Sequence, residues 1–290
     1  MKTYAEVVFE GLSPELNDVL IARLAEAGFD GFLEEGNSLK AYQDQQALDL
    51  TFLDGLCSDY GCSYRLNQIE EENWNASWES SFSPVVVENF VAVRADFHEV
   101  VKGVEYEIII TPKMSFGTGH HATTWLMMKA MRNLDLQNLD LQGRGFGGRG
   151  FGGAEVVDYG TGTGILAILA EKMGAGRVLA IDNDPWSIDN ATENLARNGS
   201  TKIRLELGEI IPGGQQFDIV LANINKHILL AHCQGICDAV KPGGLLLMSG
   251  ILREDLEDMK MSFGLYLGQP LTVEERNNWL MIAFSKGPAA

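Results

Sequence analysis

Basic residues are scarce in this sequence of 290 residues. Lysine and arginine together number 22 against 40 aspartates and glutamates, which gives a formal net charge of −18 at pH 7. We find no dense run of lysine and arginine, and a phosphate backbone is bound poorly without a basic patch. We therefore expect no direct contact with nucleic acid. An acidic surface suits a basic partner instead.

Cysteines are also few. Cys57, Cys62, Cys233 and Cys237 are the four in the chain, and none of them forms a C-x-x-C pair. No histidine lies at zinc-finger spacing from them. We expect free thiols and no bound metal.

Long apolar runs are missing. No stretch approaches the ~18 apolar residues of a membrane span. The N-terminus, Met1 to Glu6, lacks the apolar core of a signal peptide. We therefore expect a cytoplasmic protein without membrane contact, and nothing in the sequence demands more than a monomer. The hydrophobic share of 46% is enough for a sizeable core, in one large domain or in a large domain with a small one.

The first 69 residues predict a small α+β domain. Hydrophobic periodicity gives the order strand–helix–strand–strand–helix–strand, with Ser13 capping the first helix and residues 45–60 forming the second. This order is the ferredoxin-like pattern. No catalytic constellation is visible in it, which favours a recognition or packing domain.

Residues 70–84 break this pattern. Trp74 and Trp78 are four apart and would share one helix face, and Pro84 closes the segment. We interpret it as an inter-domain connector. A second irregular stretch, residues 144–153, repeats Arg-Gly-Phe-Gly-Gly twice and predicts a flexible surface loop.

The remainder, residues 85–290, predicts a second, larger domain. Strands at 85–93 and 105–110 come first, and strands then alternate with helices. Such alternation predicts an α/β fold with a doubly wound, mostly parallel sheet, whose ligands bind outside the carboxyl ends of the strands. The seven expected strands of this sheet are 155–159, 177–182, 202–207, 217–222, 243–249, 271–276 and 279–284, and the expected helices are 164–174, 184–198, 226–240 and 252–262.

A glycine-rich turn follows the first of these strands. Asp158 is followed by glycines at 160, 162 and 164, and a helical pattern begins at Ile165. Such a turn lets backbone N–H groups approach a polar ligand. Ile165 stands where the dinucleotide fingerprint needs glycine. Asp182 ends the next strand and can accept hydrogen bonds from two ribose hydroxyls, so the two features together predict a nucleoside-containing ligand.

Two further stretches carry polar groups toward the same region. Asn223 ends the fourth strand, where its amide offers an acceptor and two donors. The loop from Thr111 to Thr124 is dense in glycine, hydroxyl and imidazole groups, and such loops often contact ligands. His120 and His121 are adjacent and would point in different directions, which argues against a shared metal.

These motifs together resemble a known family. Asp158-x-Gly160-x-Gly162-x-Gly164 with Asp182 and Asn223 resembles the class I S-adenosylmethionine-dependent methyltransferases, which have a Rossmann-like fold. The stretches 116–124 (Phe-Gly-Thr-Gly-His-His-Ala-Thr-Thr), 73–78 (Asn-Trp-Asn-Ala-Ser-Trp) and 249–252 (Ser-Gly-Ile-Leu) are similar to the PrmA family of ribosomal protein L-eleven methyltransferases. The resemblance covers nearly the whole chain.

The resemblance implies S-adenosyl-L-methionine as cofactor. It also implies methylation of lysine side chains and of the N-terminal amine of a basic ribosomal protein, with residues 1–69 recognising the substrate, 70–84 letting the domains reorient and 85–290 performing the transfer. Asn223 would position the reactants, and His120 or His121 would relay a proton. The cofactor contacts that it implies are Thr124, Gly160, Asp182 and Asn223, and we expect Gly162, Phe116 and Gly117 to contact the cofactor as well.

Alternatives from other classes stay open. Methyltransferases of nucleic-acid base amines or glutamine amides usually carry Asn or Asp followed by Pro-Pro-Tyr or Pro-Phe, whereas Asn223 precedes Ile224 and Asn225. A nicotinamide-dependent oxidoreductase is disfavoured by Ile165. A non-catalytic module that only retains the pocket is the third alternative.

Overall fold

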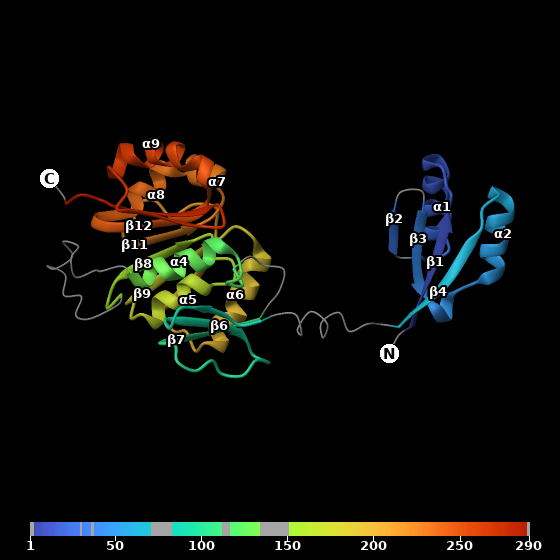
Figure 1. Cartoon of the computed structure of the whole chain (residues 1–290), viewed down its shortest axis with the longest axis horizontal. Helices are drawn as coiled ribbons and strands as arrows, with labels where there is room; N and C mark the ends of the chain where they lie inside the picture. Colours follow the sequence, from blue (N-terminus) through green and yellow to red (C-terminus); the bar gives the residue numbers. More distant parts are fainter. Residues whose placement is uncertain are drawn as a thin grey trace. The chain divides into compact units, whose positions relative to one another are not determined.

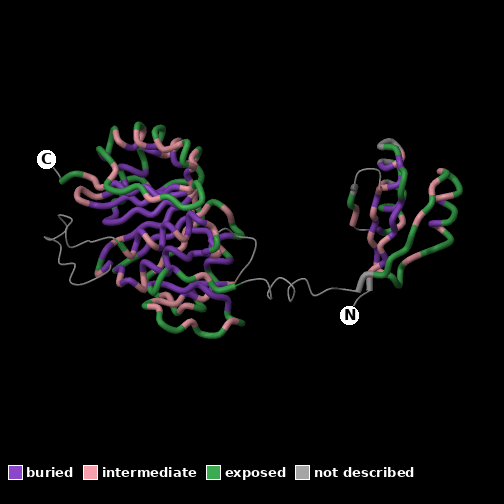
Figure 2. Tube along the Cα trace, viewed as in Figure 1, coloured by how far each residue is buried: buried purple, intermediate pink, exposed green. Residues whose placement is uncertain are grey.

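The computed structural model describes residues 3–29, 31–35, 38–70, 83–111, 117–133 and 151–288. The chain divides into two compact units, residues 1–82 and 83–290. Buried residues follow the strands and the inner faces of the helices in each unit (Figure 2). Trp74 and Trp78 of the predicted connector, Phe116 of the predicted cofactor site and residues 144–150 of the glycine-rich repeat lie outside the described residues.

The small unit is built on a four-stranded antiparallel sheet in the order β2-β3-β1-β4 (Figure 1). Strand β3 alternates between half-buried and buried residues, as expected for a sheet with one covered face. Phe9 of β1, Leu24 of α1 and Leu53 of α2 share its hydrophobic core. The elements are β1 (Thr3–Glu10), α1 (Pro14–Glu26), β2 (Gly31–Glu35), β3 (Ser38–Asp44), α2 (Leu50–Tyr60) and β4 (Tyr64–Glu70).

The second helix of this unit starts later than residue 45, where the sequence predicted it. A short 3-10 turn, η1 (Gln45–Ala47), comes first, and α2 begins at Leu50. The side chain of Asp49 accepts hydrogen bonds from the N–H groups of Thr51 and Phe52 at 2.9 and 3.2 Å. An aspartate in this geometry satisfies the first N–H groups of a helix and so fixes its start.

The large unit is built on a seven-stranded sheet in the order β10-β9-β8-β11-β12-β14-β13. The first five strands are parallel, and β14 runs antiparallel to both of its neighbours, β12 and β13. The predicted mostly parallel, doubly wound sheet is confirmed. Its strands are β8 (Glu155–Tyr159), β9 (Arg177–Asp182), β10 (Ile203–Leu207), β11 (Phe217–Asn223), β12 (Val240–Leu252), β13 (Thr272–Arg276) and β14 (Trp279–Ser285).

Helices cover both faces of this sheet (Figure 1). On one face Leu229, Ile236 and Phe263, each from a different helix, pack into one core with side chains of the strands. The order of the strands reverses between β8 and β11, and such a switch point is where doubly wound sheets bind ligands. One face carries α7 (Lys226–Ala231), α8 (Cys233–Ala239) and α9 (Leu256–Leu267), which η3 (Arg253–Asp255) precedes, and the other carries α4 (Ala122–Asn133), α5 (Ile165–Lys172) and α6 (Pro185–Arg197).

A third sheet of three strands, in the order β5-β6-β7, precedes α4. The sequence predicted one strand over 85–93. The chain instead turns between β5 (Val85–Val87) and β6 (Val91–Ala95), which pair antiparallel, and Glu88 in that turn has a positive φ of 52°. Strand β7 (Tyr106–Ile110) pairs with β6 in parallel and stands at the edge of this sheet.

Two other predictions are corrected. The helix expected over 226–240 is divided at His232, which has φ −107° and whose ring contacts the hydroxyl of Tyr159. The glycine-rich repeat is not entirely a surface loop, because Phe151 is fully buried and its N–H donates to Met173 O at 2.9 Å. Burial of one large apolar ring thus anchors the end of the repeat in front of β8.

Candidate functional site

The glycine turn lies at the carboxyl end of β8. Gly160, Gly162 and Gly164 all have positive φ, of 76°, 55° and 81°, in a region that other residues adopt only with strain. The N–H groups of Gly160 and Thr161 both donate to Ile181 O at 2.9 Å, which joins the turn to the end of β9. The alternating glycines are therefore required by the backbone path itself.

Asp182, the last residue of β9, holds this turn from the side. Its Oδ2 accepts from Gly162 N at 2.8 Å, and its Oδ1 accepts from Asp184 N at 3.0 Å. A carboxylate has about four acceptor positions. Two bonds therefore leave acceptor capacity on both oxygens for the hydroxyl groups of a ligand.

Asp158 lies beneath the turn and is fully buried. Its Oδ2 accepts from Thr161 Oγ1 at 2.6 Å and from Ala167 N at 3.2 Å. Burial raises the pKa of this carboxyl to about 7, and the nearby charge of Asp182 adds to the rise, although the two hydrogen bonds oppose it. Asp158 therefore stabilises the turn from below.

Asn223, at the end of β11, lies beside Thr124 of α4. Its Nδ2 donates to Thr124 Oγ1 at 3.3 Å, and both residues are buried. Within the described residues, Asn223 Oδ1 is buried and has no hydrogen-bond partner. An unpaired buried acceptor costs free energy, roughly 1–3 kcal/mol, so this oxygen is suited to a polar ligand.

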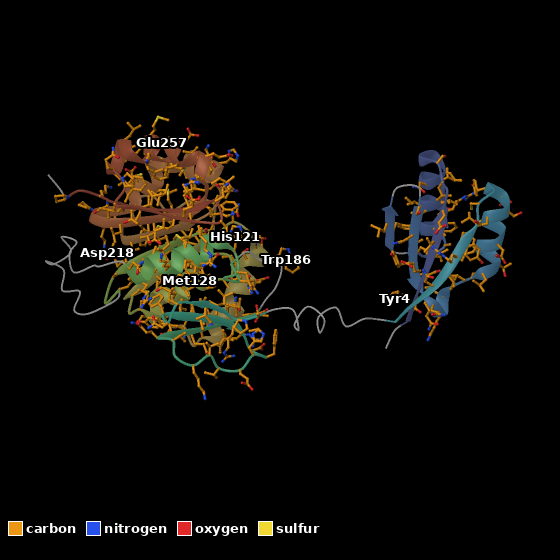
Figure 3. All side chains as sticks on the ribbon, in the orientation of Figure 1. Tyr4, His121, Met128, Trp186, Asp218 and Glu257 are labelled. Carbon is orange, nitrogen blue, oxygen red and sulfur yellow. The ribbon has the colours of Figure 1, made fainter. Side chains whose placement is uncertain are left out.

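A cavity of about 380 Å³ opens between these groups. An adjoining cavity of about 150 Å³ reaches Tyr159, Glu209 and His232 and shares five lining residues with the first. Asp218, at the start of β11, lies on the opposite side of the unit from His121 (Figure 3), as expected for a site at the carboxyl edge. The larger cavity is lined, among others, by His121, Gly160, Gly162, Asp182, Asn223, Ile224, Gly250 and Trp279.

The two adjacent histidines have different surroundings. His121 lines the larger cavity, its ring meets that of Trp279 edge to face at 4.8 Å, and its Nδ1 lies 2.8 Å from Thr123 Oγ1. Burial lowers the pKa of His121 below its usual value. His120 is exposed, with Nε2 2.9 Å from Ser83 O. Of the two histidines proposed from the sequence, the geometry thus favours His121 over His120 as the group that meets a ligand.

Gly117 of the same loop is bound to the glycine turn. Thr163 Oγ1 donates to Gly117 O at 2.7 Å, and a Cβ at Gly117 would lie 2.8 Å from Thr163 Oγ1. This packing explains why the loop needs glycine here. The structure therefore brings Gly117, Thr124, Gly160, Gly162, Asp182 and Asn223 of the predicted set to one edge of the sheet.

Sequence reasoning did not assign Gly250 or Trp279 to this site, although it placed Ile224 beside Asn223. Ile224 and Trp279 line the cavity, and Gly250 lies against Ile224 so closely that a Cβ would be 2.1 Å from Ile224 O. A signal existed for Gly250, which belongs to the Ser-Gly-Ile-Leu motif. Nothing local marks Trp279, because the antiparallel pairing of β14 with β12 is what brings it to this edge.

No metal centre is visible in the part of the chain that the structure describes. It holds no group of three or more histidine, cysteine, aspartate or glutamate side chains suited to a metal ion. No helix among these residues is long and apolar enough to cross a membrane.

The site combines a glycine turn after the first strand, an acidic residue at the end of the second and an asparagine at the end of the fourth. On a doubly wound sheet, this combination defines an S-adenosylmethionine-dependent methyltransferase with a Rossmann-like fold. A solved structure agrees with this class. The ribosomal protein L11 methylase of Lactobacillus delbrueckii subsp. bulgaricus superimposes with a TM-score of 0.59 at 28% identity, over 71% of this chain and 100% of that one.

The chain belongs to the ribosomal protein L11 methyltransferase (PrmA) family, whose model matches residues 23–287. Relatives of that name cover almost its entire length. The one from Phocaeicola vulgatus is 34% identical over 97% of this chain and 98% of its own, and the one from Porphyromonas gingivalis is 38% identical over 92% and 90%. The protein is therefore a protein methyltransferase, and its cofactor is S-adenosyl-L-methionine.

Proposed function

We propose that this protein transfers methyl groups from S-adenosyl-L-methionine to lysine side chains and the N-terminal amine of ribosomal protein L11. The observation that carries the proposal is that relatives named for this substrate match nearly the whole chain, the small unit included. A match confined to the large unit would support only the cofactor and the class of reaction.

We assign substrate recognition to residues 1–69, which we propose to be a ferredoxin-like domain. Its sheet order, β2-β3-β1-β4, and its strand–helix order both support that fold. Residues 70–84, with Trp74 and Trp78, then act as the connector, and 85–290 as the transferase domain. The net charge of −18 supports a basic substrate, and we propose a cytoplasmic monomer.

The described residues fit the cofactor. Asp182 has acceptor capacity for the ribose hydroxyls, Gly160 and Gly162 keep side chains out of the cavity, and Asn223 Oδ1 is a buried acceptor without a partner in the described chain. Thr124 and Gly117 complete the proposed set, together with Phe116. When bound, the cofactor supplies an electrophilic methyl group on a sulfonium centre.

The protein's own task is to present an uncharged amine. A lysine amine has a reference pKa of about 10.4 and must lose a proton before it attacks. His121 lines the cavity, and its lowered pKa keeps the imidazole neutral at pH 7, which is the form that accepts a proton. We therefore assign proton acceptance to His121 and alignment of the amine to Asn223.

Incubation of the purified protein with methyl-labelled S-adenosylmethionine and purified ribosomal protein L11 tests this function. We expect label on lysines and on the N-terminal amine of that protein, located by mass spectrometry. Ribosomal RNA and a protein with exposed glutamine side chains serve as matched substrates, and label on either one instead would favour the alternative methyltransferase classes. Absence of label on all three would contradict the proposal.

A further inference from the structure

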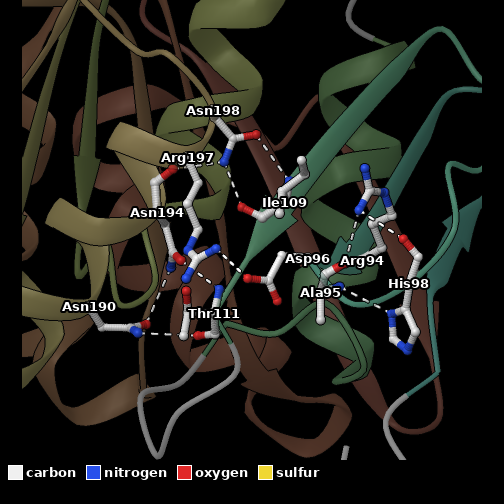
Figure 4. Close-up of polar contacts among 10 residues, drawn as sticks. All are labelled: Arg94, Ala95, Asp96, His98, Ile109, Thr111, Asn190, Asn194, Arg197 and Asn198. Carbon is white, nitrogen blue, oxygen red and sulfur yellow. Dashed lines mark hydrogen bonds and ion pairs between the residues drawn. The ribbon is translucent and has the colours of Figure 1, made fainter.

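Three asparagines of α6 and its C-cap face one edge of strand β7. Asn190, Asn194 and Asn198 are four residues apart, so they lie one above the other on the helix (Figure 4). Asn190 and Asn194 are buried, with 1% and 0% of their surface exposed. Their amides meet backbone groups of Ile109 and Thr111, at and just beyond the end of β7.

Asn198 behaves as a strand partner would. Its Oδ1 accepts from Ile109 N at 3.0 Å, and its Nδ2 donates to Ile109 O at 2.6 Å. An edge strand otherwise leaves such groups unpaired, at a cost in stability when they are buried. This amide therefore completes β7, and none of its hydrogen bonds within the described residues reaches the cofactor site.

Asn194 differs because it reaches two segments of the site. Its Oδ1 accepts from Thr111 N at 2.7 Å, and its Nδ2 donates both to Thr163 O in the glycine turn at 2.8 Å and to Asn190 Oδ1 at 3.3 Å. Asn190 in turn donates to Thr111 O at 3.2 Å. One buried amide thus links the residue after β7 to the glycine turn.

Gly117 belongs to the loop that begins at Thr111, and it is bound to Thr163 as well. Thr163 Oγ1 donates to Gly117 O, so Thr111 is bound through Asn194 and Gly117 is bound directly. Helix α6 also packs on the turn, because a Cβ at Gly164 would lie 3.1 Å from Leu195 Cδ1 and 3.4 Å from Ala191 Cβ. The turn and the loop therefore have a common anchor.

We propose that Asn194 is a positioning residue for the cofactor site, which sets the glycine turn relative to the loop that leads to Gly117 and Thr124. It acts through the backbone of Thr111 and Thr163 and does not line the cavity described above. The inference rests on the proposed cofactor contacts of the turn. It extends the site to a residue that touches neither the substrate nor the reacting atoms.

The test compares Asn194→Asp with Asn198→Asp. Asn194→Asp keeps an acceptor for the N–H of Thr111, and Asn198→Asp keeps one for the N–H of Ile109. In each variant the amide donor is replaced by an oxygen, which then faces a carbonyl oxygen. Both variants are expected to melt at a lower temperature than the wild type. Only Asn194→Asp is expected to raise the Kd for S-adenosylhomocysteine, by about tenfold or more, because only its donor meets the glycine turn.

Isothermal titration at a temperature where all the proteins are folded supplies the readout. A merely destabilised variant would show fewer competent sites at an unchanged Kd, whereas a displaced turn weakens every site. In steady-state assays, Asn194→Asp should raise the KM for S-adenosylmethionine while kcat changes by less than about threefold. Equal Kd values for the two variants would overturn the inference.

A milder variant keeps the inference testable if Asn194→Asp does not fold. Asn190→Ala removes one partner of the Asn194 amide and the bond to Thr111 O, and we expect the Kd to rise by about threefold. An unchanged Kd in that folded variant overturns the inference as well. Failure of the wild-type chain to bind S-adenosylhomocysteine would instead contradict the proposed cofactor site, so the two failures are distinguishable.

Discussion

The Nδ2 of Asn223 donates a hydrogen bond to Thr124 Oγ1 across 99 positions of sequence, at 3.3 Å. This bond joins the end of the fourth parallel strand to the first turn of α4 and fixes which way the amide faces. Its Oδ1 is thereby directed to a buried position where the described residues offer no donor. The pair therefore prepares an acceptor at the carboxyl edge of the sheet before any ligand arrives.

We expect Asn223→Ala to lower kcat/KM for methyl transfer by about 100-fold, because it removes a preorganised polar group from the site. Thr124→Val, which keeps the shape but loses the acceptor for Nδ2, should cost about tenfold. The two residues act as a unit, so the double variant should be little worse than Asn223→Ala. Strictly additive losses in the labelled-methyl assay would show that the bond has no role in the site.

Asp182→Asn should weaken binding of S-adenosylhomocysteine by about 10- to 100-fold, since hydrogen bonds to a charged group are worth about 1.5–3 kcal/mol. Asp184→Asn is the matched control. Asp184 caps α6 by accepting from Trp186 N at 3.1 Å. Asparagine keeps a capping oxygen at this position, so thermal stability should change little and the Kd should stay within about threefold. Calorimetric titration measures both, and a larger effect at position 184 would contradict the ribose assignment.

His121→Gln should lower kcat/KM by about 100-fold. In the wild type the rate should fall only at a pH below the range in which an ordinary histidine titrates, because burial lowers the pKa of His121 and its imidazole becomes charged only under more acidic conditions. The variant should lack that inflection. His120→Gln, at the neighbouring exposed position, should keep both the rate and the profile, and the reverse result would restore His120 to the catalytic role.

Gly250→Ala should destabilise the fold by about 3 kcal/mol or more, because the new Cβ would lie 2.1 Å from the backbone oxygen of Ile224 at a φ of +87°. Gly199→Ala is the control for backbone strain alone. Gly199 has φ +65° with nothing within 4 Å of a Cβ, so its variant should lose only about 1 kcal/mol. Denaturant unfolding compares them, and equal losses would refute the close approach.

The pKa of Asp158 is raised to about 7 by burial, which sets the sign of a stability effect. Between its unfolded pKa and about pH 7 the unfolded chain binds fewer protons than the folded one, so the free energy of unfolding falls as pH rises and then levels off. Asp158→Asn removes this dependence. Relative to the wild type, the variant should gain about 2 kcal/mol between about pH 5.5 and about pH 8, measured by denaturant unfolding, and no relative gain would place the pKa of Asp158 near its ordinary value.

Much of the fold could be predicted from local pattern. Alternation of apolar strands and amphipathic helices gave the doubly wound sheet, because each element needs only its own periodicity to show which face is buried. The divided helix at His232 was not predictable, since the ring contact with Tyr159 joins residues 73 positions apart. The start of α2 was missed although Asp49 carries a readable capping signal.

By itself the sequence determined the cofactor and the family. Glycines at 160, 162 and 164 together with Asp182 predict a nucleoside-containing ligand, and the resemblance of the motifs to a known family implies that it is S-adenosyl-L-methionine. The tertiary structure alone decided that His121 and not His120 faces the cavity, that Trp279 meets its ring, and that Asn194 joins β7 to the glycine turn. Those relationships depend on how elements distant in sequence pack together. The sequence around an asparagine in a helix does not predict which backbone groups its amide will bind.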